Sequence, residues 1–170
     1  MRPMGYEDHK HLSPEHVNCA VLIISDSRDA RSDESGKLLV EALKNHGHPV
    51  SSFDFLKNDA GAISLKFDEL INREGLQAVI MSGGTGASKR DVTIETVTPL
   101  LDKVLPGFGE LFRSLSYQEI GSGAILSRAL AGVARGRAVI CLPGSVKAVN
   151  LALEKIILPE IGHLVREASR

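Results

Sequence analysis

Short runs of apolar, β-branched residues alternate along this chain with segments in which apolar residues recur at the spacing of a helix. The runs that we expect to be strands are residues 17–25, 48–56, 77–81 and 137–142. Strands that alternate with helices pair in parallel, because each helix carries the chain back to the starting edge of the sheet. The pattern predicts an α/β fold of three layers, α/β/α, with a mostly parallel sheet in the middle.

The segments between these strands have helical periodicity and recognisable ends. A helix over residues 34–46 stops at Gly47, because glycine readily takes the left-handed conformation found after helices. Asp59 precedes a second helix, which ends near Gly75. Further helices are expected over residues 94–101, 109–117 and 126–133, then from Val146 to about Ile156, with a last short helix after Pro159.

The chain has the size and composition of one folded domain. It has 170 residues, of which 43% are hydrophobic and 24% charged, as in an ordinary globular protein rather than a disordered one. No repeat or linker divides residues 17–170, which we expect to form a single domain. Residues 1–16 are polar and lack apolar periodicity, so we expect a flexible tail.

Charge and hydropathy exclude several classes of function. Twenty Lys and Arg against 21 Asp and Glu give a net charge of −1, too small for the whole surface to attract nucleic acid or an anionic membrane. Apolar runs such as Ala20 to Ile24 are far shorter than the roughly 20 residues of a membrane-spanning helix. The N-terminus lacks the apolar stretch of a secretory signal, so we expect a cytoplasmic protein with no nucleic acid or membrane partner.

Three loops after expected strands are rich in residues that bind anions or metals. In a parallel sheet the carboxyl ends of the strands meet at one edge, and ligands bind there. The loops read SDSRDARSDESG after the first strand, SGGTGASKRD after the third and LPGSVK after the last. Connections of this kind are usually short, with one capping residue, so three enriched loops at one edge predict a single composite site.

The glycine-rich loop carries the clearest signal. Gly83, Gly84 and Gly86 lack the Cβ atoms that keep an anion away from the backbone, and they permit positive φ, so consecutive N–H groups can face an oxyanion. The glycines alone are equally compatible with a tight turn that binds nothing. The adjacent Lys-Arg-Asp of residues 89–91 favours the binding interpretation.

Known phosphate-binding motifs do not account for this loop. A dinucleotide-binding fingerprint starting at Gly84 needs its third glycine where Lys89 stands, and the chain has no G-x-x-x-x-G-K-[ST]. It also lacks the G-x-S-x-G of an α/β-hydrolase. A dehydrogenase, a P-loop enzyme and a hydrolase of that type are therefore unsupported.

The last loop and several carboxylates fit the same kind of site. Pro143 and Gly144 set a turn after which Ser145 can cap a helix. Carboxylates near a phosphate crevice would hold Mg²⁺, which prefers oxygen ligands, although N-capping of helices is their ordinary role. Four of them follow strand runs or occupy first-turn positions: Asp26, Asp33, Asp59 and Asp91.

Several motifs occur together and in order over nearly the whole chain. They are SDS, SGGTG followed by RDVTIET, PGFGE, ILSRALAG and LPGS. In this combination the sequence resembles the MogA/MoaB family of molybdenum cofactor biosynthesis proteins, which is related to the G domain of gephyrin. The run FRSLSYQEIGSGAILSRALAGV is more similar to the MoaB branch than to MogA.

The resemblance implies an activity and a set of site residues. Active members of the family are adenylyltransferases that use Mg²⁺, transfer AMP from ATP to the terminal phosphate of molybdopterin and release pyrophosphate. It implies Asp59 and Asp91 as catalytic carboxylates and magnesium ligands. The residues expected to contact ATP or molybdopterin are Ser25, Asp26, Asp33, Gly83, Gly84, Thr85, Gly86, Lys89, Arg90, Ser127, Arg128, Pro143, Gly144 and Ser145.

The resemblance leaves an alternative function and implies an assembly. Some MoaB-branch proteins lack the carboxylate that corresponds to Asp59; its presence here favours an enzyme, and the alternative is a non-catalytic paralogue that binds molybdopterin. Family members are trimers or, in the MoaB branch, hexamers, so we expect a homo-oligomer, with the hexamer favoured over the trimer. An apolar stripe offers either core packing or subunit contacts: Phe108, Leu111, Phe112 and Leu115.

Overall fold

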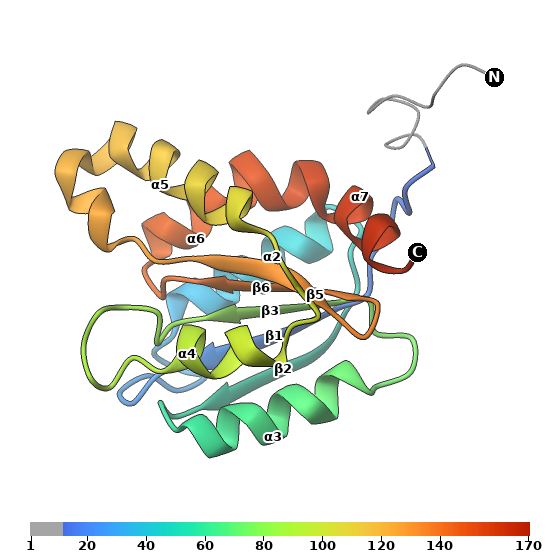
Figure 1. Cartoon of the computed structure of the whole chain (residues 1–170), viewed down its shortest axis with the longest axis horizontal. Helices are drawn as coiled ribbons and strands as arrows, with labels where there is room; N and C mark the ends of the chain where they lie inside the picture. Colours follow the sequence, from blue (N-terminus) through green and yellow to red (C-terminus); the bar gives the residue numbers. More distant parts are fainter. Residues whose placement is uncertain (1–11) are drawn as a thin grey trace.

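The computed structural model describes residues 12–170 and contains a six-stranded sheet with helices on both faces (Figure 1). The strand order is β2-β1-β3-β6-β5-β4, and the first four of these run parallel. The four predicted strands are confirmed as β1 (Cys19–Ile24), β2 (Val50–Leu56), β3 (Ala78–Ser82) and β6 (Arg137–Leu142). The three-layer α/β/α architecture is therefore confirmed.

The central strands are buried on both sides. Every residue of β1 and β3 is buried, as is every residue of β6 after Arg137. Strands covered on two faces have no polar side to present, which explains why they read as continuous apolar runs rather than alternating ones. No helix within residues 12–170 is long and apolar enough to cross a membrane.

Four helices cover one face of the sheet (Figure 1). They are α2 (Glu34–Asn45), α5 (Pro106–Ile120), α6 (Val146–Ala152) and α7 (Leu158–Ala168). A π-helical segment, Leu153–Ile157, joins α6 to α7, so the chain stays helical where the sequence predicted a break at Pro159. Pro159 lies in the first turn of α7 and has no N–H to donate to the preceding turn, a common setting for irregular helical hydrogen bonding.

The other face is covered by α3 (Ala60–Ile71) and α4 (Thr93–Val97), the latter continued by a short 3₁₀ turn, Thr98–Leu100. The side chains that the sequence placed on one face of α3 are all buried: Ile63, Phe67, Leu70 and Ile71. Because α2 and α3 lie on opposite faces, the chain passes from β1 out to β2 over one face and returns to β3 over the other.

The helix predicted over residues 126–133 is wrong. A 3₁₀ helix, Gly121–Leu126, ends there, and β5 (Leu130–Ala134) runs antiparallel to β6. The two strands are joined by a tight turn of Arg135 (φ 47°) and Gly136 (φ 76°), with positive φ at both positions as the right-handed twist of a two-residue hairpin favours. The apolar spacing of the segment suits either structure, and the pairing with β6 decides between them.

The sheet ends in a strand that the sequence analysis did not predict. β4 (Lys103–Val104) pairs antiparallel with β5, and two residues are too few to show a strand pattern. Gly132 of β5 lies so close to β4 that an added Cβ would sit 2.4 Å from the carbonyl oxygen of Lys103. This edge pairing therefore depends on a glycine.

The apolar residues predicted to form a stripe on α5 lie partly in the core and partly at the surface. Phe112 is buried, while Phe108 and Leu115 pack against the core and remain partly exposed. Leu111 is 47% exposed. Most of the expected N-terminal tail, residues 1–16, lies outside the described residues; within the described part, the Pro14 carbonyl lies close to Gly162 of α7.

We predict that Gly132→Ala destabilises the protein by about 2 kcal/mol, because the new methyl group overlaps the β4 backbone, which has little room to shift. The measurement is the free energy of unfolding from urea denaturation. Gly107→Ala, at an α5 position where a Cβ meets nothing within 4 Å, is the matched control and should be neutral or stabilising by up to about 1 kcal/mol. Equal stability of both variants would contradict the assigned pairing.

Candidate functional site

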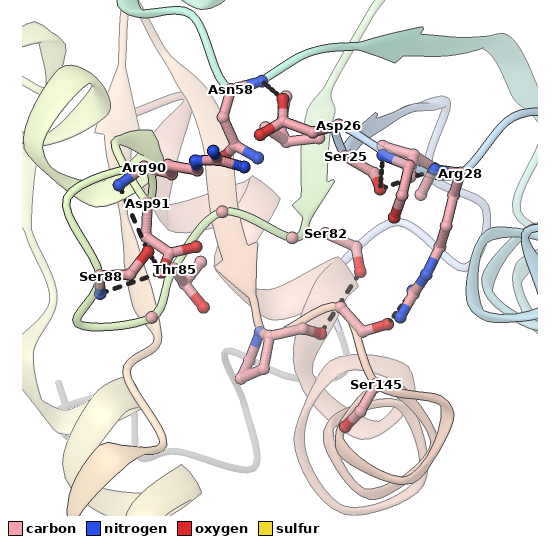
Figure 2. A pocket seen from close by; sticks show the side chains of 18 of the residues that line it. Ser25, Asp26, Arg28, Asn58, Ser82, Thr85, Ser88, Arg90, Asp91 and Ser145 are labelled. Atoms are coloured by element: carbon pink, nitrogen blue, oxygen red, sulfur yellow. Dashed lines mark hydrogen bonds between the residues drawn. The ribbon is translucent and has the colours of Figure 1, made fainter.

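A cleft of about 430 Å³ opens at the carboxyl edge of the parallel strands, between the loops that follow β1, β3 and β6 (Figure 2). β1 and β3 are neighbours, but the chain leaves β1 toward β2 on one side and leaves β3 toward the opposite edge of the sheet. This divergence leaves a crevice between the two loops, the position where open α/β sheets bind ligands. The three loops singled out in the sequence thus meet around one cleft, with Asn58 from the loop after β2 beside them.

The glycine loop packs against the end of β1 without room for side chains. Gly83 has φ 105° and Gly84 φ 63°. A Cβ on Gly83 would lie 2.1 Å from the carbonyl oxygen of Ile24, and one on Gly84 would lie 2.2 Å from Oδ1 of Asn58. Thr93 secures the loop from the other side, since its hydroxyl donates to the Gly83 carbonyl and its N–H to the Gly84 carbonyl, both at 2.9 Å.

Asp91 closes the far end of the same loop. Its Oδ2 accepts hydrogen bonds from the Ser88 N–H at 3.1 Å and from the Ser88 hydroxyl at 2.6 Å. A Cβ on Gly86 would lie 2.7 Å from this oxygen, so glycine is required here too. Asp91 and Thr85 both line the cleft, and Oδ1 of Asp91 has no hydrogen-bond partner among the described residues.

The three predicted cations of this region take different positions. Arg90 lines the cleft, and Figure 2 shows its side chain extending toward Asn58. Lys89 is exposed and is not among the lining residues. Arg128 donates to the Gly86 carbonyl at 2.9 Å and pairs with Glu95, whose pKa this hydrogen bond lowers. Arg128 thereby ties the glycine loop to α4 and is not among the residues that line the cleft.

The loop after β1 is held by its own hydroxyl and by contacts to the other loops. Ser25 Oγ accepts the N–H groups of Ser27 at 3.3 Å and Arg28 at 3.0 Å. Oδ1 of Asp26 accepts the backbone N–H of Asn58 at 3.0 Å, and Arg28 reaches the carbonyl of Gly144. Ser25, Asp26 and Arg28 all line the cleft.

Two of the four predicted carboxylates cap helices instead of lining the cleft. Asp33 is fully buried and caps α2 by accepting the Gly36 N–H at 2.7 Å. Asp59 is exposed and caps α3 by accepting the Ala62 N–H at 2.7 Å. Asp26 and Asp91 are the members of this set that face the cleft.

The turn after β6 supplies the remaining wall. Pro143, Gly144 and Ser145 line the cleft, and Ser145 Oγ caps α6 by accepting the Ala148 N–H at 3.2 Å. Ser127 lies outside this cleft and lines a neighbouring cavity of about 240 Å³, which shares Pro143 and Ser145 with it. The predicted residues of the last loop therefore meet those of the first and third.

Sequence reasoning missed several residues that line the cleft. Arg28 lies inside the first enriched loop, Asn58 directly precedes Asp59, and Ser88 lies inside the glycine loop. Their positions in those loops were the available signal. Asn58 is distinctive because its buried Oδ1 has no hydrogen-bond partner in the described structure, whereas buried polar atoms normally have one.

The described residues contain no group of three or more His, Cys, Asp or Glu side chains placed to hold a metal ion. Mg²⁺ does not need one, because it commonly binds one or two carboxylates and takes its other ligands from substrate phosphates and water. Asp26 and Asp91, which both line the cleft beside the backbone of Gly83 and Gly84, fit that requirement.

Comparison with known proteins agrees with this geometry. Residues 20–163 match the family described as "Probable molybdopterin binding domain". Molybdenum cofactor biosynthesis protein B of Bacillus subtilis is 47% identical over 165 residues, 96% of this chain and 97% of the relative. A protein of the same name from Bacillus cereus is 46% identical over 168 residues, 98% of this chain and 99% of the relative.

Solved structures show the same fold. A crystal structure of a molybdenum cofactor biosynthesis protein B superposes with a TM-score of 0.88 at 48% identity, covering 92% of this chain and 98% of the other. The tungsten cofactor synthesizing protein MoaB from Pyrococcus furiosus gives a TM-score of 0.84 at 36% identity, with 93% and 100% coverage. The chain therefore belongs to the MogA/MoaB family of molybdenum cofactor biosynthesis proteins, on its MoaB branch.

Proposed function

We propose that this protein acts in molybdenum cofactor biosynthesis by adenylylating molybdopterin. In this reaction a terminal phosphate oxygen of molybdopterin attacks the α-phosphorus of ATP. The bond from that phosphorus to the bridging oxygen breaks, and pyrophosphate leaves with the electron pair. The observation that carries the proposal is the cleft itself, in which an open glycine backbone, two arginines and two carboxylates face one space at the switch point of the sheet.

Transfer of AMP does not require the protein to form a covalent bond with the substrate. Phosphoryl and nucleotidyl transfer depend chiefly on placing the reacting groups and offsetting their charge. Gly83 and Gly84 line the cleft with backbone alone, so a phosphate can approach their main-chain atoms closely. Arg90 brings positive charge to the same space, and its attraction for phosphate grows as substrates displace water.

Two carboxylates in the cleft would hold magnesium. Asp91 presents a free Oδ1, while its Oδ2 is occupied by Ser88. Asp26 similarly uses Oδ1 for Asn58. When bound, Mg²⁺ neutralises phosphate charge and polarises the bond to the leaving pyrophosphate. Asp59, which caps α3 next to the cleft-lining Asn58, stays a proposed magnesium carboxylate on the strength of the family resemblance.

A non-catalytic protein that binds molybdopterin is the alternative. The position of Asp59 favours this alternative, because Asp59 caps α3 and is not among the residues that line the cleft. The two functions differ in one measurable product. An enzyme releases pyrophosphate only when ATP, Mg²⁺ and molybdopterin are all present, whereas a binding protein releases none.

We also propose that the protein forms a homo-oligomer, a hexamer or a trimer. Beside α5 lies an apolar cavity of about 300 Å³ lined by Leu105, Phe108 and Leu111 among others, the kind of surface that subunit contacts cover. Sedimentation at micromolar concentration should give a mass three or six times that of the chain. A sedimentation mass equal to that of one chain would refute this proposal.

We predict that Asp91→Asn lowers AMP transfer by at least about 100-fold, because the amide keeps an acceptor for Ser88 but carries no charge for a metal. Pyrophosphate release measures the rate, and circular dichroism checks the fold. Asp68→Asn on α3, outside the cleft, is the matched control and should retain full activity. Near-wild-type release by the Asp91 variant would refute the proposed role of this carboxylate.

Asp59 can be tested by separating its two roles. Asn caps helices about as well as Asp, so Asp59→Asn should leave the unfolding free energy within a few tenths of a kcal/mol, whereas Asp59→Ala should lose about 1 kcal/mol. If Asp59 also serves magnesium, both variants lose pyrophosphate release. An Asn variant with full activity would show that Asp59 is a helix cap and nothing more.

A further inference from the structure

Arg28 lines the cleft on the side opposite Arg90 and Asp91 (Figure 2), although it is not among the site residues predicted from the sequence. It belongs to the loop between β1 and α2, and its side chain is 42% exposed. An arginine that faces a proposed phosphate cleft needs a structural explanation or a ligand.

One nitrogen of the guanidinium makes all of its contacts with the protein. Nη1 donates to the carbonyl oxygen of Gly144 at 2.5 Å and to Ser35 Oγ at 3.3 Å, and it lies 3.6 Å from Oδ1 of Asp33. Nε and Nη2 have no partner among the described residues. The guanidinium is therefore anchored through Nη1, with the edge formed by Nε–H and Nη2–H left free.

Asp33 does not fully neutralise the positive charge of Arg28, because its carboxylate also accepts hydrogen bonds from other groups. Its carboxylate accepts the Gly36 N–H at 2.7 Å and the Ser35 hydroxyl at 2.8 Å, at the positive end of the 12-residue helix α2. Arg28 forms an ion pair with this carboxylate at 3.6 Å, a separation longer than a hydrogen bond. The N-terminus of α2 and Ser35 thus supply the hydrogen bonds of the Asp33 carboxylate. Asp33 holds Arg28 in place through the ion pair, and the Nε–Nη2 edge of Arg28 remains able to attract an anion.

We propose that the Nε–Nη2 edge of Arg28 is an oxyanion subsite that binds a phosphate group of one of the two substrates. A guanidinium edge matches two phosphate oxygens and binds them bidentately, which a single ammonium cannot do. With Arg90 on the opposite side, the cleft holds a separate cation for each of two phosphate-bearing molecules. The identity of the ligands rests on the proposed function; the anion chemistry of the edge does not.

The test compares Arg28→Lys and Arg28→Gln with the wild type. Lys keeps the positive charge and a donor for the Gly144 carbonyl but removes the free edge, and Gln also removes the charge. Calorimetry measures the dissociation constants of ATP with Mg²⁺ and of molybdopterin separately, so that no turnover occurs. Arg73→Lys, an arginine paired with Glu69 on the surface outside the cleft, is the matched control.

We expect Arg28→Lys to weaken binding of one ligand by about 10-fold or more, Arg28→Gln to weaken it further, and Arg73→Lys to leave both constants unchanged. The affected ligand identifies which substrate phosphate lies on Arg28. Wild-type affinity of the Lys variant for both ligands would overturn the subsite and leave Arg28 as a tie between loops. Weaker binding of both ligands together with a lowered unfolding temperature would overturn it as well.

The binding constants, together with pyrophosphate release, distinguish failure of the Arg28 subsite from failure of the proposed adenylyltransferase activity. If binding depends on Arg28 but no pyrophosphate is released when both substrates are present, the adenylyltransferase is refuted and the subsite stands. If pyrophosphate is released and Arg28→Lys binds both ligands normally, the subsite is refuted and the enzyme stands.

Discussion

The site depends on how closely the loop after β3 approaches the end of β1. Gly83 passes the Ile24 carbonyl at a distance that excludes any Cβ, and its N–H bonds the carbonyl of Leu142 at the end of β6 at 2.9 Å. This contact joins three parallel strands at their carboxyl ends, where the chain diverges and a crevice forms. A side chain at Gly83 would force the loop away from the end of β1.

The loops around the crevice are held mainly by groups that do not face it. Thr93, Arg128 and Asp33 support the glycine loop or Arg28 from outside the lining, each through side-chain hydrogen bonds or a charge contact. A site that binds charged molecules must have its polar groups in position beforehand, because ordering them on binding costs free energy. The buried and half-buried supports therefore matter to function although they touch no ligand.

Much of the architecture could be predicted from the sequence because its elements are long or strongly periodic. α3 has apolar residues at helical spacing, and β1 and β3 are short apolar runs that alternate with helical segments. The apolar spacing of residues 126–133 predicts a helix but also fits a strand, and only the hairpin turn at Arg135 and Gly136 and the pairing with β6 distinguish the two. The apolar pattern within a segment does not show which distant strand the segment will pair with.

In the site, likewise, features set by neighbouring residues could be predicted from the sequence, and features set by contacts between distant segments could not. The glycine loop could be recognised because its three glycines after a strand are followed closely by Lys89, Arg90 and Asp91. The role of a charged residue depends on contacts that sequence spacing does not contain. Asp33 and Asp26 lie seven positions apart in one loop, yet the first is buried under a helix end and the second faces the cleft. Arg28 is held by Gly144, 116 positions away, so its orientation follows from the meeting of two loops and not from the motif around it.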